Sequence, residues 1–119
     1  MISERIENKI EDLGFRINTI GEGEFGRTEP IEYEIEFWSD AGEDVVFYIG
    51  GLTDREFVEM FSDYAASFDP DEHAETYVSM RGSRGVPETI RELLDDADGI
   101  KKTLENAAHQ LRQEVMSND

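Results

Sequence analysis

Apolar and acidic residues alternate strictly in the stretch Ile31-Glu32-Tyr33-Glu34-Ile35-Glu36-Phe37. Successive side chains of a β-strand point to opposite faces of a sheet, so this pattern predicts a strand whose apolar residues face a core and whose acids face outward. A short turn, Ser39-Asp40-Ala41-Gly42-Glu43, separates it from the apolar run Val45-Val46-Phe47-Tyr48-Ile49. Strands joined by so short a connection pair antiparallel, and residues 31–49 therefore predict a β-hairpin.

The segment before the hairpin predicts one helix and one further strand. Apolar residues recur at helical spacing between Ser3 and Leu13, and Gly14 supplies a stop signal. Phe15 to Ile20 has the pattern of a strand. The three glycines among residues 21–26 disfavour regular structure, so a loop is predicted there.

Two helices are predicted directly after the hairpin. Thr53 and Glu56 fit a capping box that opens a helix through about Ala66. Its predicted inner face consists of Phe57, Met60, Phe61 and Tyr64. Asp69-Pro70 combines an N-cap with a proline in the first turn, which predicts a second helix to about Arg81.

The C-terminal segment predicts the longest helix, which opens at Pro87 after a loop at 82–85. Its apolar residues alternate between spacings of three and four, which is typical of a packing seam. The seam consists of Ile90, Leu93, Ala97, Ile100, Leu104, Ala107 and Leu111. Gly99 weakens the middle and leaves open whether the helix divides. We expect the seam to pack within a monomer, and pairing in a homodimer is the alternative.

These elements predict a single α+β domain over residues 1–119, in the order α-β-β-β-α-α-α. The three strands form an antiparallel sheet with the helices packed on one face. Seven Phe, four Tyr and one Trp argue for a folded chain, because disordered acidic segments are poor in aromatic residues.

The chain is strongly acidic, with 29 acids, 11 bases and a net charge of −18. Residues 28–80 hold fifteen acids and a single base, Arg55, and so carry −14. Direct binding of nucleic acid is disfavoured because phosphates would be repelled. The absence of cysteine excludes disulfides and thiolate chemistry. Residues 1–7 have no continuous apolar stretch, so no signal peptide is expected. No segment of the chain has the apolar length of a membrane span, and the host cytoplasm is the expected location.

The acids of the central region form the candidate binding surface, here named the acidic band. Successive outward residues of a strand lie roughly 6.6 Å apart, which makes a regular line of charge. Such a line suits a cleft that normally neutralises phosphates. The acidic band consists of Glu32, Glu34, Glu36, Asp40, Glu43, Asp44, Asp69, Asp71, Glu72 and Glu75. Solubility, helix-dipole complementation and adaptation to high salt are the simpler interpretations of the same acids.

No grouping of residues predicts catalysis, a cofactor or a metal ion. His73 lies one helical turn from Asp69. A metal site usually needs three or more converging ligands, and this single histidine with its neighbouring acids does not predict one. His109 is interpreted as a surface or seam-edge residue. Gly50-Gly51 lacks the other residues of a phosphate loop and is interpreted as a turn. Trp38 fits an exposed binding anchor and a rim residue of the core equally well.

The C-terminal half resembles a group of small acidic proteins encoded on phages and conjugative elements of gut Firmicutes. The resemblance rests on Phe68-Asp69-Pro70-Asp71-Glu72-His73-Ala74-Glu75, on Arg81-Gly82 and on residues 85–97. It implies a genomic setting that includes anti-CRISPR and anti-restriction inhibitors, several of which imitate DNA. It assigns no functional residues.

The leading hypothesis is a non-enzymatic inhibitor whose acidic band blocks a basic, nucleic-acid-handling partner, such as a CRISPR effector or a restriction enzyme. The alternative is a structural or regulatory interaction module that binds a partner through the C-terminal seam.

Overall fold

The computed structural model describes residues 1–20, 32–51, 53–80 and 89–117, with the backbone alone for 77–80. The predictions for the loops at 21–26 and 82–85, for Ile31 and for Pro87 lie outside the described residues. The elements are α1 (Glu4–Asp12), β1 (Arg16–Ile20), β2 (Glu32–Trp38), β3 (Asp44–Gly50), α2 (Asp54–Ser67), α3 (Pro70–Met80) and α4 (Ile90–Met116). The predicted order and the α+β class are confirmed.

The three strands form an antiparallel sheet in the order β1-β2-β3. Ile35 in the middle strand faces Ile17 on one side and Phe47 on the other. Tyr33, Ile35 and Phe37 are buried while the glutamates between them point outward, as the alternation predicts. β2 is the middle strand of the sheet, and β2 and β3 both alternate between buried and outward residues.

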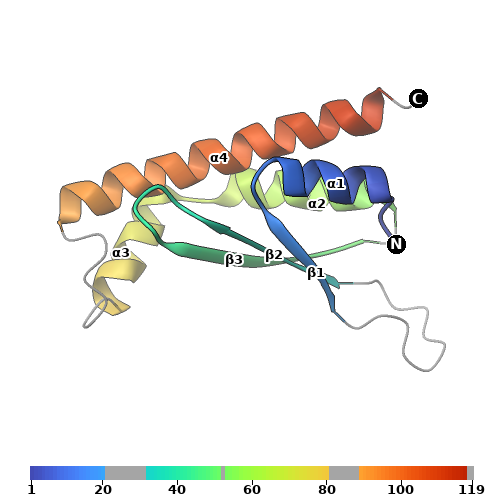
Figure 1. Ribbon diagram of the computed structural model, residues 1–119. Coiled ribbons are helices and arrows are strands. Elements are labelled where there is room, and N and C mark those ends of the chain that lie inside the picture. The colour runs from blue at the N-terminus through green and yellow to red at the C-terminus, as the bar shows by residue number, and fades with distance from the viewer. Residues whose placement is uncertain (21–31, 52, 81–88, 118–119) are drawn as a thin grey trace.

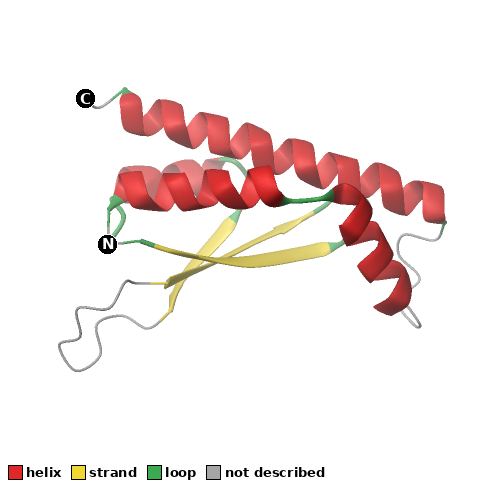
Figure 2. Cartoon of the chain, turned by 180° about the vertical axis from the view of Figure 1, so that it is seen from behind, coloured by secondary structure: helices red, strands yellow, loops and turns green. Residues whose placement is uncertain are grey.

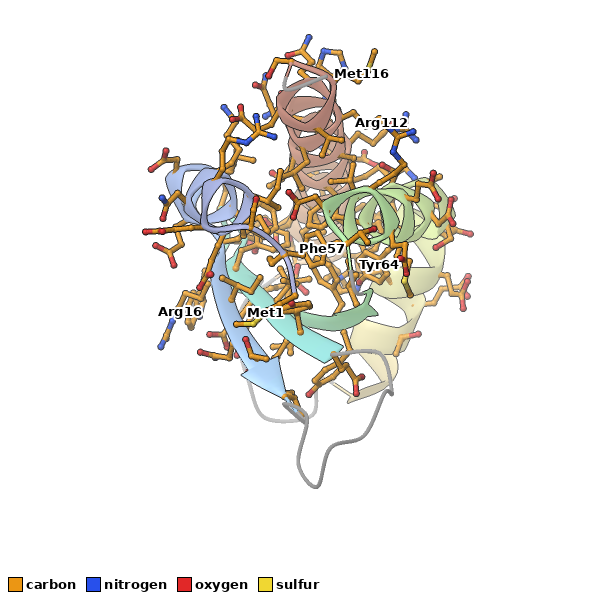
Figure 3. All side chains as sticks on the ribbon, turned by 90° about the vertical axis from the view of Figure 1, so that its right-hand side faces the viewer. Met1, Arg16, Phe57, Tyr64, Arg112 and Met116 are labelled. Atoms are coloured by element: carbon orange, nitrogen blue, oxygen red, sulfur yellow. The ribbon has the colours of Figure 1, made fainter. Side chains whose placement is uncertain are left out.

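The helices cover one face of the sheet (Figures 1 and 2). Viewed from the end in Figure 3, α1 and α2 lie side by side above the sheet, and α4 lies on top between them. The same view shows Phe57 and Tyr64 pointing into the interior, whereas Arg16 lies on the outside of the sheet. In the part of the chain that the structure describes, no helix covers the other face, which we name the open sheet face.

Aromatic contacts join the sheet to α2. The ring centroids of Phe47 and Phe61 are 5.5 Å apart, and those of Tyr33 and Phe57 are 5.4 Å apart. These rings are buried, and large aromatic side chains contribute much of the apolar area that a domain of this size removes from water. The prediction that Met60 joins this face is wrong, because Met60 is exposed and Val58 and Ala65 are buried in its place.

The last helix is continuous through Gly99, so the possible division into two helices does not occur. It begins at Ile90 because Thr89 caps its first turn by accepting a hydrogen bond from the Glu92 amide at 3.1 Å. The seam packs inside the chain as expected, with all its members after Ile90 buried. Ile90 itself departs from the prediction, because 63% of its surface is exposed.

The turn after β3 depends on one glycine. Gly51 has φ of 139°, and a Cβ there would lie 3.0 Å from the backbone nitrogen of Phe57. Both the conformation and the close approach favour glycine at this position. The interpretation of Gly50-Gly51 as a turn agrees with this steric role.

Candidate protein-interaction surface

The structure divides the acidic band between separate parts of the surface. Glu32, Glu34, Glu36 and Asp44 lie together on the open sheet face, and Asp40 is exposed in the turn of the hairpin. A second group surrounds the N-terminal half of α3 and consists of Asp69, Asp71, Glu72 and Glu75, all exposed. Glu43 belongs to neither group.

The glutamates of β2 form the central row of the open sheet face. Strand alternation places the three carboxylates on the side away from the helices, roughly 6.6 Å apart. Because β2 is the middle strand, side chains of both neighbours flank this row. The outward residues of the two flanking strands are Arg16, Asn18, Ile20, Asp44, Val46 and Tyr48.

Cross-strand contacts hold two of these glutamates in place. Tyr48 Oη donates to Glu34 Oε2 at 3.3 Å, and Asn18 Nδ2 donates to Glu34 Oε1 at 3.5 Å. Arg16 pairs with Glu36 at 3.6 Å. Such exposed contacts are individually weak, but they reduce the number of positions the carboxylates adopt.

The concentration of carboxylates perturbs proton binding on this face. The Glu34 carboxylate raises the pKa of Tyr48, with partial loss of water as a further cause. Partial loss of water, followed by the neighbouring carboxyl of Asp44, raises the pKa of Glu36. The Tyr48 shift, and the part of the Glu36 shift that comes from Asp44, indicate that an additional negative charge is unfavourable here.

Large apolar side chains lie beside the carboxylates. Trp38 is 52% exposed and Tyr48 is 55% exposed, and Val46 and Ile20 are exposed as well. Trp38 faces Asp44 across the hairpin. Its exposure fits both a binding anchor and a rim residue of the core, so its role stays a prediction. Exposed aromatic side chains among charges are typical of protein interfaces, where they supply contact area.

The prediction that Glu43 extends the acidic band is wrong, because only 6% of its surface is exposed. Glu43 precedes Val45 by two residues and therefore shares the inward face of the hairpin with it. His73 Nε2 of α3 lies 3.0 Å from Glu43 Oε1. Glu43 Oε2 is buried without a hydrogen-bond partner among the described residues. Extending the alternation backwards from Val45 would have indicated this orientation.

Asp96 of α4 completes a polar cluster, which we define as Ser39, Glu43, His73 and Asp96. Ser39 Oγ donates to Asp96 Oδ2 at 2.5 Å, and the Ala41 amide donates to Asp96 Oδ1 at 2.9 Å. Ser39 Oγ also accepts from the Glu43 amide at 2.9 Å. The polar cluster thus fixes the tip of the hairpin against both α3 and α4. Asp96 was not predicted from the sequence, because it is one of several acids in the same helix.

Burial and contact with Asp96 raise the pKa of Glu43 to about 8, so its carboxyl is mostly protonated at neutral pH. Burial lowers the pKa of His73, against the opposing effect of Asp96. Burial alone would raise the pKa of Asp96, but contacts with Glu43, Ser39 and the Ala41 amide hold it below its usual value. At neutral pH, Asp96 is therefore the single charged group of the polar cluster.

The polar cluster is not arranged as a metal site. In the described ranges, no group of three or more His, Asp or Glu side chains is placed to hold a metal ion. Asp69 caps the N-terminus of α3, because its Oδ1 accepts hydrogen bonds from the amides of Asp71 and Glu72 at 3.0 and 3.4 Å. The capping interpretation of Asp69 is thereby supported.

Comparisons with known protein families, with curated proteins and with solved structures give no match for this chain. The resemblance to mobile-element proteins therefore stays a prediction. Among the described residues, no helix combines the length and the apolar character needed to cross a membrane.

Proposed function

We propose that the chain is a non-enzymatic binding protein that presents its open sheet face to a basic, nucleic-acid-handling protein and blocks it. The observation that carries this proposal is the row formed by Glu32, Glu34 and Glu36 on the middle strand, on the sheet face that no described helix covers. The row is regular, it is flanked by further exposed side chains, and its cross-strand contacts limit its movement.

The physical basis is competition for a cationic surface. A nucleic-acid-binding cleft places Lys and Arg side chains against closely spaced phosphates, and binding there is dominated by this charge neutralisation. A row of carboxylates satisfies the same cations, and a partner occupied in this way no longer admits nucleic acid. An anti-CRISPR or anti-restriction activity would follow from such occupation of a nuclease.

Exposed apolar side chains add contact area that the carboxylates alone do not supply. Trp38 and Tyr48 flank the row on the same face, and aromatic residues are frequent anchors of protein interfaces. An indole or phenol ring also receives a guanidinium group favourably. We therefore expect an arginine-rich contact surface on the partner.

The alternative function is partner binding through the C-terminal seam, and most of the seam is not exposed in this structure. The members of the seam from Ile100 to Leu111 are buried in the chain's own core, Leu93 and Ala97 are buried as well, and Ile90 at the start of α4 is exposed. Exposing the members from Ile100 to Leu111 to a partner would require α4 to leave the domain.

Affinity capture from the host tests the proposal. A tagged chain is compared with a sheet-face variant, Glu32→Gln, Glu34→Gln and Glu36→Gln together, and with a helix variant, Glu4→Gln, Glu11→Gln and Glu105→Gln together. Both variants lose the same charge, and all three residues of the helix variant are exposed. We expect the wild type and the helix variant to capture a basic nucleic-acid-binding protein, identified by mass spectrometry, and the sheet-face variant to lose it.

Equal capture by the two variants would contradict the proposal. So would a captured protein that neither binds nucleic acid nor carries a basic surface. Far-UV circular dichroism establishes that each variant keeps its helices and its sheet.

A further inference from the structure

A groove lies between α3 and the first turns of α4, apart from the open sheet face. Its volume is about 390 Å³, and it is lined by Asp71, Ala74, Glu75, Ile90, Leu93 and Leu94. Ala74 and Leu93 are buried, whereas Ile90 and Leu94 are 63% and 39% exposed. The groove therefore has a buried apolar floor and exposed apolar side chains along α4.

The wall on α3 has the opposite character. Asp71 and Glu75 are exposed and lie one turn apart on α3, as Ile90 and Leu94 do on α4. An acidic wall and an apolar wall thus run along the two sides of one groove. The occupant that complements both must be apolar on one side and cationic on the other.

We propose that this groove binds an amphipathic basic α-helix of a partner protein. Its apolar residues would pack against Ile90 and Leu94, and its Lys or Arg side chains would pair with Asp71 and Glu75. The inference goes beyond the proposed function, because the groove is built from other elements than the sheet and is tested without the partner of the sheet.

A helix fits these walls better than a strand or a small molecule. Both walls are helices whose backbone groups are bonded internally, so they offer no free edge for an added strand. A small ligand is normally enclosed on most sides, whereas the apolar wall here is itself exposed. Apolar anchors one turn apart match the spacing of residues along the face of a packed helix.

The polar cluster holds the groove in shape. His73 precedes Ala74 of the floor and contacts Glu43, while Asp96 follows Leu93 by one turn and is bonded to the hairpin tip. Both helices of the groove are thus attached to the same turn of the sheet. A preformed groove binds with a smaller loss of conformational entropy than one that must first assemble.

The probe is a fluorescein-labelled synthetic helix of leucine and lysine, followed by fluorescence anisotropy. Ile90→Ser with Leu94→Ser is expected to weaken its binding about tenfold or more. Asp71→Asn with Glu75→Gln is expected to weaken binding by a smaller factor that shrinks as salt is added. Met60→Ser with Met116→Ser is the matched control, because both methionines are exposed on other surfaces, and it is expected to bind as the wild type does.

Two further comparisons make the result decisive. A peptide with serine in place of leucine is expected to bind much more weakly, and the sheet-face variant is expected to bind the leucine–lysine helix as the wild type does. The proposal is overturned if the serine peptide binds equally well, or if Ile90→Ser with Leu94→Ser retains full affinity. Loss of binding in the sheet-face variant would place the peptide on the sheet and would also overturn it.

Discussion

Glu43 combines burial with an acidic side chain, and this combination gives it an unusual proton affinity. Its pKa of about 8 lies far above the 4.5 of an exposed glutamate. A protonated carboxyl avoids the cost of placing a second negative charge beside Asp96. The contact with His73 is accordingly a hydrogen bond between neutral groups near neutral pH.

The first prediction concerns Glu43→Gln and the pH dependence of unfolding. Because the folded pKa is raised, the stability that Glu43 contributes is fully present below pH 4.5 and is lost as pH rises through about 8. Above pH 6.5, His73 stays neutral and Asp96 stays ionised, so Glu43 is the member of the polar cluster that titrates. The wild type should lose roughly 2 kcal/mol of unfolding free energy between about pH 6 and about pH 9.

Glu43→Gln should remove most of this loss, and the measurement is urea unfolding across the pH range. The exposed residue Glu59 provides a control, since Glu59→Gln should leave the pH dependence as in the wild type. An identical decline in Glu43→Gln and the wild type would show that Glu43 is ionised or exposed in solution.

The burial of the two acids in the polar cluster could not be predicted from the sequence. The alternation correctly predicted that Tyr33, Ile35 and Phe37 are buried in the core, because apolar side chains are more stable away from water. Glu43 and Asp96 carry no such signal, since an acid is buried only where tertiary contacts compensate it. In a chain with so many acids, the local sequence around the two buried acids does not differ from that around the exposed ones.

At the scale of elements, α4 organises the domain. Its seam packs against α1 and α2, and its residue Asp96 receives the hairpin turn. The seam was predictable because its spacing is local to one helix. The attachment of the hairpin was not predictable, because Ala41 and Asp96 are 55 positions apart in the sequence and no local pattern relates them. Ile90 fits the spacing but lies beyond the part of α4 that the core covers, so it is exposed.

The second prediction tests the seam. Leu104 is fully buried, so Leu104→Ala should lower the unfolding free energy by roughly 2–5 kcal/mol. Its solution mass, measured by light scattering over a range of concentrations, should not change. A stable dimer that Leu104→Ala converts into a folded monomer would contradict the intramolecular seam.

The third prediction tests the attachment of the hairpin to α4. Asp96→Ala removes an ionised acceptor of two hydrogen bonds and should cost about 1.5–3 kcal/mol in thermal or urea unfolding. The adjacent Asp95 is exposed, and Asp95→Ala should change stability by about 0.5 kcal/mol or less. If the two variants unfold alike, Asp96 does not hold the hairpin.

At the scale of the whole molecule, the net charge of −18 is distributed unevenly. Fold topology places most acids of the central region on the open sheet face and around the N-terminal half of α3. Adaptation to high salt would explain abundant acids, but it requires no regular row beside exposed aromatic residues. Self-repulsion between these carboxylates opposes folding, which makes screening by salt stabilising.

The fourth prediction follows from this repulsion. Sodium chloride should raise the melting temperature of the wild type, because the Debye length falls from about 10 Å at 0.1 M to about 3 Å at 1 M. The sheet-face variant should start from a higher melting temperature at low salt and gain less on addition of salt. A melting temperature that falls with salt, or an equal gain in both proteins, would show that the row of glutamates causes no measurable repulsion.

Site-specific crosslinking in host extract tests whether the open sheet face occupies a nucleic-acid-binding surface of a partner protein. Val46 on this face is replaced by p-benzoyl-phenylalanine, and Lys102, exposed on α4, is replaced in a control protein. We expect a crosslink to a basic nucleic-acid-binding protein from position 46 alone, abolished by excess duplex DNA. A crosslink that persists in excess DNA, or that forms equally from position 102, would contradict it.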